Sequence, residues 1–63
     1  MTKTNNAKTM MELAQWKVNR CYQETVEARE RSDHNAEQMW RSRFIKAEKI
    51  FQTRVAEYLV TLS

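Results

Sequence analysis

The chain has 63 residues, of which 41% are hydrophobic and 30% are charged, and its formal net charge is +3. Its single cysteine and single histidine exclude an intrachain disulfide and a Cys/His zinc site, and the lack of glycine excludes a glycine-rich phosphate loop. Proline is also absent, so the chain contains neither of the residues that usually break helices, and long helices are expected. A chain this short buries little surface by itself and is expected to gain stability by oligomerisation.

The first eight residues are polar, and we expect residues 1–8 to form a flexible N-terminal segment. This segment lacks the apolar core of a signal peptide. No apolar run in the chain approaches the roughly 20 residues that a membrane-spanning helix requires. The sequence therefore predicts a cytoplasmic protein with no membrane partner, in the host cytoplasm if the chain is phage-encoded.

A first helix is predicted from about residue 8 to about residue 31, within a helical unit that covers residues 9–62. Two N-terminal caps fit the sequence, namely Asn5 or Asn6 and, about one turn later, Thr9 paired with Glu12. The inward face of this helix is expected to need bulky side chains opposite it, because most of its own are small. At helical spacing this face contains Met11, Ala14, Val18, Cys21, Tyr22, Thr25 and Ala28.

A turn is predicted at residues 32–35, where Ser, Asp, His and Asn interrupt the apolar pattern. Asn35 tolerates a left-handed conformation better than most residues other than glycine. Asn35 and Gln38 form a candidate capping pair for the next helix. The alternative is one unbroken helix of about 80 Å, at 1.5 Å per residue.

A second helix is predicted from about residue 36 to about residue 62. Its apolar positions follow spacings of four, four, three, four, four, three and four: Ala36, Trp40, Phe44, Ala47, Phe51, Val55, Tyr58 and Leu62. This repeat averages about 3.67 residues per turn and does not predict a left-handed coiled coil. If the chain reverses near residues 33–34, the bulky rings lie opposite the small residues of the first helix. The predicted fold is all-α, an antiparallel helical hairpin.

Each predicted helix carries a second apolar strip that a lone hairpin would leave exposed. These strips contain Leu13 and Trp16 in the first helix, and Met39, Ile45, Ile50, Ala56 and Leu59 in the second. Exposed apolar patches usually mark interfaces. We therefore expect a homo-oligomer, either a four-helix-bundle dimer or a larger assembly.

A basic strip is predicted on one flank of the second helix. It consists of Arg43, Lys46, Lys49 and Arg54, with Met39 and Ile50 beside it. With the separate patch of Leu13 and Trp16 on the first helix, these residues form the candidate partner-binding set: Leu13, Trp16, Met39, Arg43, Lys46, Lys49, Ile50 and Arg54. The strip suits an acidic protein face or phosphate groups, and the alternative is a solvated helix flank. The aromatic residues that would stack on bases are predicted on the other face, which favours a protein partner over single-stranded nucleic acid.

The sequence gives no sign of catalysis. Cys21 is predicted on the inward face with no base beside it, and His34 is predicted in the turn. Exposed glutamates without a pocket do not form a site. We therefore expect no enzyme activity, no metal and no cofactor.

In layout, a helical hairpin of this length resembles the Rop-type plasmid regulators, which dimerise into four-helix bundles and bind RNA loops. Short phage proteins that sequester signalling nucleotides are also hairpins. The main prediction is a small helical protein–protein interaction module, a regulator or inhibitor of a host or partner protein, from a phage or mobile element. The alternatives are a binder of nucleic acid or of a small anionic nucleotide that uses the basic strip, and a purely structural subunit.

Overall fold

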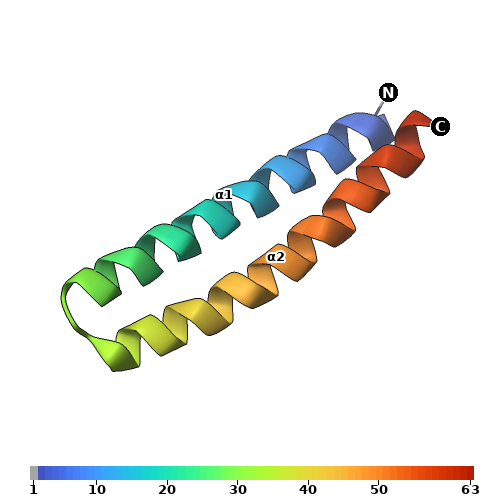
Figure 1. Cartoon of the computed structure of the whole chain (residues 1–63). Helices are drawn as coiled ribbons and strands as arrows, with labels where there is room; N and C mark the ends of the chain where they lie inside the picture. The colour runs from blue at the N-terminus through green and yellow to red at the C-terminus, as the bar shows by residue number, and fades with distance from the viewer. Residues whose placement is uncertain (1) are drawn as a thin grey trace.

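The structure, a computed structural model, describes residues 2–63 and places them in two antiparallel α-helices (Figure 1). Helix α1 spans Thr2–Glu30 and helix α2 spans His34–Leu62. They lie side by side in a hairpin measuring 47 × 13 × 11 Å, with the start of α1 beside the end of α2. The prediction of an all-α helical hairpin is confirmed, and an unbroken rod is excluded.

Helix α1 begins well before the predicted start at about residue 8. Residues 2–8, which we expected to be flexible, are helical, and residue 1 lies outside the described residues. The predicted caps at residues 5–6 and at Thr9 are wrong, because these residues lie inside α1. Thr4 and Ala7 are half-buried, so packing supports a helix that the polar sequence does not reveal. Between residues 2 and 63, neither helix has a stretch apolar enough to cross a membrane.

The C-terminus of α1 ends in a Schellman-type arrangement. The Asp33 N–H donates a hydrogen bond to the Ala28 carbonyl (2.9 Å), and the Ser32 N–H donates to the Arg29 carbonyl (3.0 Å). Ser32 adopts the left-handed conformation, with φ at 59°. Glycine is the residue that usually occupies this position, so Ser32 holds a conformation that costs about 1–2 kcal/mol for a residue with a Cβ atom.

The N-terminus of α2 is capped by Asp33, whose carboxylate accepts a hydrogen bond from the Ala36 N–H at 3.1 Å. The prediction that Asn35 is left-handed and caps the helix with Gln38 is therefore wrong. Asn35 lies in the first turn of α2, because Asp33 already supplies the cap two residues earlier.

The two faces that meet between the helices follow a heptad spacing. In α1, residues that are buried or half-buried alternate at three and four positions: Thr4, Ala7, Met11, Ala14, Val18, Cys21, Thr25 and Ala28. In α2 the same alternation connects Glu37, Trp40, Phe44, Ala47, Phe51, Arg54, Tyr58 and Thr61. A spacing of about 3.5 residues is that of a left-handed coiled coil. The predicted stripe of α2 is largely confirmed beside it, because seven of its eight residues, all except Leu62, are half-buried.

This spacing changes the membership of the inward faces. Tyr22 and Leu62, which we predicted to face inward, are more than half exposed. Arg54 and Thr61, which we did not predict to face inward, are half-buried, and both fall on the heptad spacing. The Tyr22 ring still lies beside Phe44, with 5.9 Å between the ring centroids.

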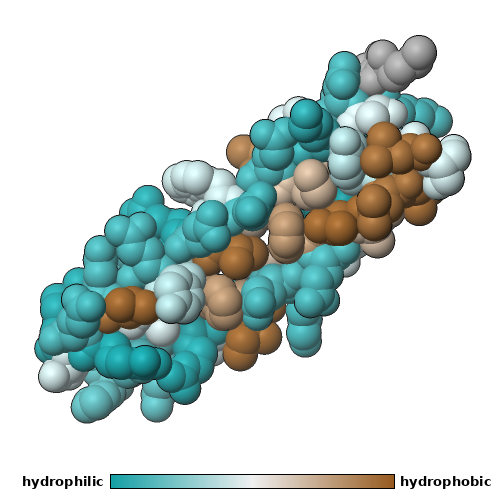
Figure 2. All heavy atoms as spheres, turned by 45° about the horizontal axis from the view of Figure 1, so that its top comes forward, coloured by the Kyte–Doolittle hydropathy of each residue, from teal (hydrophilic) through white to brown (hydrophobic). Residues whose placement is uncertain are grey.

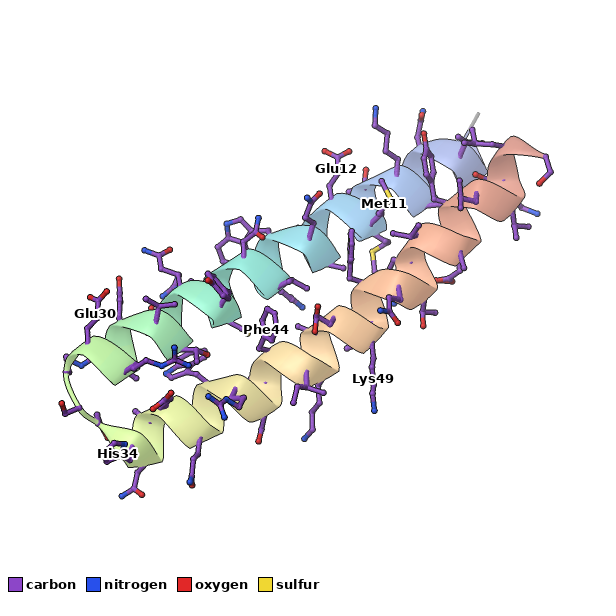
Figure 3. All side chains as sticks on the ribbon, viewed as in Figure 1. Met11, Glu12, Glu30, His34, Phe44 and Lys49 are labelled. Carbon is purple, nitrogen blue, oxygen red and sulfur yellow. The ribbon has the colours of Figure 1, made fainter. Side chains whose placement is uncertain are left out.

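The core matches small side chains of α1 with large side chains of α2. Ala28 is 0% exposed, and Ala14 and Thr25 are also buried. The larger rings of Trp40 and Phe44 are half-buried, and Figure 3 shows Phe44 between the helices. The buried Thr25 hydroxyl donates to the Cys21 carbonyl at 2.8 Å, which satisfies its hydrogen bond within α1.

An ion-pair cluster around Glu37 ties the helices together near the loop. Arg29 Nε of α1 donates to Glu37 Oε2 at 2.9 Å, and Arg41 Nη2 lies 3.4 Å from the same oxygen. His34 Nδ1 lies 3.9 Å from Glu37 Oε1, and the Glu37 side chain is only 15% exposed. The hydrogen bond from Arg29 and the surrounding positive charges lower the pKa of the Glu37 carboxyl, against the opposing effect of burial.

Candidate partner-binding groove

A groove of about 360 Å³ lies between the two helices along one side of the hairpin. Its lining comes from the middle of both helices. We call it the basic groove; it is lined by Met10, Leu13, Ala14, Trp16, Lys17, Arg20, Cys21, Trp40, Arg43, Lys46, Ala47, Ile50 and Arg54.

The groove is hollow because small residues face each other across its floor. Ala14 is buried, and Cys21 and Ala47 are half-buried, so none of them fills the space between the helices. Larger apolar side chains line the more exposed part of the groove, including Trp16, which is 59% exposed, and Ile50, which is also exposed. The floor and inner walls are therefore apolar and open to solvent.

Figure 2 shows how apolar side chains are distributed over one face of the molecule. On that face, the end at which the termini lie carries the larger hydrophobic areas, whereas the loop end is mostly hydrophilic. The exposed large hydrophobic residues follow the same trend, since most belong to the half of the hairpin away from the loop. Apolar surface that a partner can cover is thus concentrated away from the ion-pair cluster.

All the charged residues of the groove are cations, and both helices contribute them. Lys17 and Arg20 come from α1, and Arg43, Lys46 and Arg54 come from α2. No aspartate or glutamate is among the lining residues within the described part of the chain. This distribution gives the groove a positive potential that attracts negative groups.

These cations differ in how far they are already engaged. Arg20 pairs with Glu24 at 3.3 Å, and Arg54 pairs with Glu57 at 2.8 Å. Arg43 stacks on Trp40, with its guanidinium carbon 5.0 Å from the ring centroid.

The other two cations of the groove, Lys17 and Lys46, are exposed and have no ion pair within residues 3–63. Arg43 likewise has no carboxylate partner among these residues. Three cations of the groove therefore remain available to an incoming anion.

The structure brings six of the eight predicted partner-binding residues together in this groove: Leu13, Trp16, Arg43, Lys46, Ile50 and Arg54. It does not include Met39 and Lys49 in the lining. Met39 is exposed outside the groove, and Lys49 points away from α1 (Figure 3). A role for any of these residues in binding stays a prediction.

Seven lining residues were not predicted as partner-binding: Met10, Ala14, Lys17, Arg20, Cys21, Trp40 and Ala47. Helical spacing contains a signal for two of them. Lys17 follows Leu13 by four positions, and Arg20 follows Trp16 by four positions, so each lies on the flank of its predicted neighbour. The small floor residues carry no such signal.

The expected separation of aromatic and basic residues is wrong. Trp16 and Trp40 are the only tryptophans in the chain, and both line the groove with the cations. Trp40 belongs to the inward face, but its indole is large enough to reach the groove and lie beneath Arg43. The groove thus combines aromatic surface with positive charge.

The groove offers binding contacts and no general acid–base pair. Cys21 is its only thiol, and the single histidine lies near the loop beside Glu37. Among the residues that the structure describes, no three His, Cys, Asp or Glu side chains are placed to hold a metal ion. What the groove supplies is apolar contact area surrounded by cationic hydrogen-bond donors.

Comparisons with protein families, with curated proteins and with solved structures find no match to this chain. Function is therefore inferred from the residues and geometry of the basic groove.

Proposed function

We propose that this hairpin is a non-catalytic interaction module that binds a partner protein through the basic groove, as a small regulator or inhibitor in the cytoplasm. One observation carries the proposal: an apolar floor is flanked by five cations from both helices, with no carboxylate in the lining. Protein interfaces combine an apolar centre with a polar rim in this way. By occupying the partner's surface, the hairpin would block the contacts that this surface normally makes.

The hydrogen-bonding groups of the groove favour a protein over a nucleotide. Apart from the two indole N–H groups, its polar side chains are all cations, which donate hydrogen bonds and accept none. Adenine, guanine and cytosine also carry amino groups that require acceptors, and the backbone carbonyls of both walls are engaged within helices. Carboxylates of a protein require only hydrogen-bond donors, and its apolar side chains require only apolar contact, and the groove supplies both.

A second candidate is the binding of nucleic acid or of a small anionic nucleotide. The exposed Trp16 ring beside the cations favours it, because bases stack on aromatic side chains while phosphates bind lysine and arginine. Binding of this kind weakens steeply as salt increases, whereas an apolar protein contact does not.

Capture of partners by matched variants tests the proposal. A tagged chain is used to recover proteins from an extract of the cells that express it, and the recovery is repeated with Arg43→Glu/Lys46→Glu and with Lys49→Glu. We expect the double variant to lose its specific proteins and Lys49→Glu to retain them, since Lys49 lies outside the groove. If both variants recover the same proteins as the parent, the groove does not bind the partner. If recovery is lost on nuclease treatment or at higher salt, the binding of nucleic acid is favoured instead.

We also propose that the hairpin self-associates, as a four-helix-bundle dimer or a larger oligomer. Its support is the exposed apolar surface outside the groove, which includes Tyr22, Ile45, Leu59, Val60 and Leu62. Light scattering over a wide concentration range should give the mass of at least a dimer. A monomer mass throughout would contradict this part of the proposal.

A further inference from the structure

We infer that the segment of the partner that fills the basic groove is an acidic amphipathic α-helix, which lies along α1 and α2 as a third helix. The inference rests on the proposed function and names the chemistry of the partner. Three features carry it: the length of the groove, the nature of its walls and the sign of its charges.

The groove is elongated along the hairpin. Its lining extends from Met10 to Cys21 in α1 and from Trp40 to Arg54 in α2. At 1.5 Å per residue these stretches measure about 16 Å and about 21 Å, which is three to four helical turns. A helix of that length, lying between two antiparallel helices, matches this shape.

The walls offer an extended peptide no backbone partners. An extended peptide satisfies its backbone groups by pairing with a sheet edge, and both walls are α-helices whose backbone groups are bonded internally. A helical segment forms its own backbone hydrogen bonds, so it loses none when it enters an apolar groove. Its apolar stripe can then contact Leu13, Trp16 and Ile50.

The positive charges of the groove favour a helix that carries acidic residues on both flanks. Lys17 and Arg20 stand on the α1 side, while Arg43 and Lys46 stand on the α2 side, and all four are exposed. Glutamates on both flanks of the incoming helix would therefore meet a cation on either side. The same charges disfavour a second copy placed groove to groove, because Lys17, Arg43 and Lys46 would face the same cations of the other copy.

Four probes test the inference with the full chain. The first is a peptide of about 15 residues, or four turns, with leucine at helical spacing and glutamate on both flanks. The second replaces each glutamate with lysine, the third shuffles the acidic peptide so that the leucines share no face, and the fourth is a single-stranded RNA oligonucleotide. Tryptophan emission reports occupancy, because both tryptophans of the chain line the groove.

We expect the acidic helix to bind at least about tenfold more tightly than the basic or the shuffled peptide, as a few exposed ion pairs can provide. Arg43→Glu/Lys46→Glu should reverse the preference toward the basic peptide, and Lys49→Glu should leave it unchanged. Lys17→Glu/Arg20→Glu, on the opposite wall, is a second test should the first variant fail to fold by circular dichroism.

Equal binding of the acidic and basic peptides, or of the acidic and shuffled peptides, would overturn the inference. So would loss of a dimer, seen by light scattering, in the groove variants. If no peptide binds but the cellular partner is still lost from Arg43→Glu/Lys46→Glu, the inference fails and the proposed function stands. If RNA binds and no peptide does, both fail.

Discussion

The loop end of the hairpin and the basic groove use similar residues to opposite effect. Near the loop, Arg29 and Arg41 both pair with Glu37, and Ala28 is completely buried. In the groove, Arg43 and Lys46 have no carboxylate partner within residues 3–63, and Ala47 leaves a hollow. The loop end therefore uses its charges and small residues to stabilise the fold, whereas the groove leaves its own available to a ligand.

The largest expected effect on stability comes from replacing Ala28 with leucine, and the same substitution at Ala47 is its comparison. Ala28→Leu should destabilise the hairpin by about 1–3 kcal/mol, because the site has no space for three more carbon atoms. Ala47→Leu should change the free energy of unfolding by no more than about 0.5 kcal/mol, since its side chain can extend into the groove.

Thermal or urea unfolding followed by circular dichroism measures both effects. Ala47→Leu should also abolish binding of the acidic helical peptide, because it fills the floor. Equal destabilisation by the two variants would show that the groove is packed as tightly as the loop end, and the contrast between the regions would be lost.

A second prediction concerns acid. Because pairing with Arg29 lowers the pKa of Glu37, the cluster stabilises the hairpin above the usual carboxyl value of 4.5 and loses that contribution as the pH falls through the lowered pKa. Glu37→Gln should therefore unfold at a lower temperature than the parent near neutral pH and show less further loss in acid. Melting temperatures across a pH series measure this difference.

Glu12→Gln, on an exposed position of α1, is the control and should retain the acid-dependent loss of the parent. If Glu37→Gln and Glu12→Gln give the same pH profile, the ion-pair cluster does not hold the loop end together.

A smaller stabilising effect is expected at Ser32, the left-handed residue of the loop. Ser32→Gly should raise the free energy of unfolding by about 0.5–1 kcal/mol, because glycine has no Cβ atom to strain this conformation. Ser42→Gly, in the exposed interior of α2, should lower it by a similar amount. Unfolding curves of the two variants should shift in opposite directions, and shifts in the same direction would contradict the assignment of the cap.

The smallest effect on stability is expected within the groove itself. Lys46→Glu removes no ion pair found among the described residues, so it should alter the free energy of unfolding by less than about 0.5 kcal/mol. The same variant should weaken binding of the acidic peptide. A large loss of stability would mean that Lys46 serves the fold, as the residues near the loop do.

Much of the fold follows from the sequence because Trp40, Phe44 and Phe51 are large and recur at helical spacing. The turn was found within one or two residues, since Ser32 and Asp33 stand among the few turn-forming residues of the chain. The inward positions of Arg54 and Thr61 were missed because both residues are polar, so counting apolar residues passes over them.

The groove was harder to predict than its rim. Trp16 and Arg43 are conspicuous on exposed flanks, so their helical positions identify them. Ala14 and Ala47 are equally compatible with close packing and with a hollow, and only the positions of the two helices in space decide between them. The role of Trp40 was missed for a related reason, since a side chain assigned to the core can still reach an open edge.

The heptad spacing of the hairpin restricts any helix that accompanies it for its whole length. A straight helix drifts by about 20° per heptad relative to this spacing, so over two heptads its contact stripe would rotate by roughly 40°. That rotation is enough to turn a terminal apolar side chain toward water. Binding partners that repeat every seven residues should consequently gain more from added turns than partners of equal hydrophobicity that repeat every eleven.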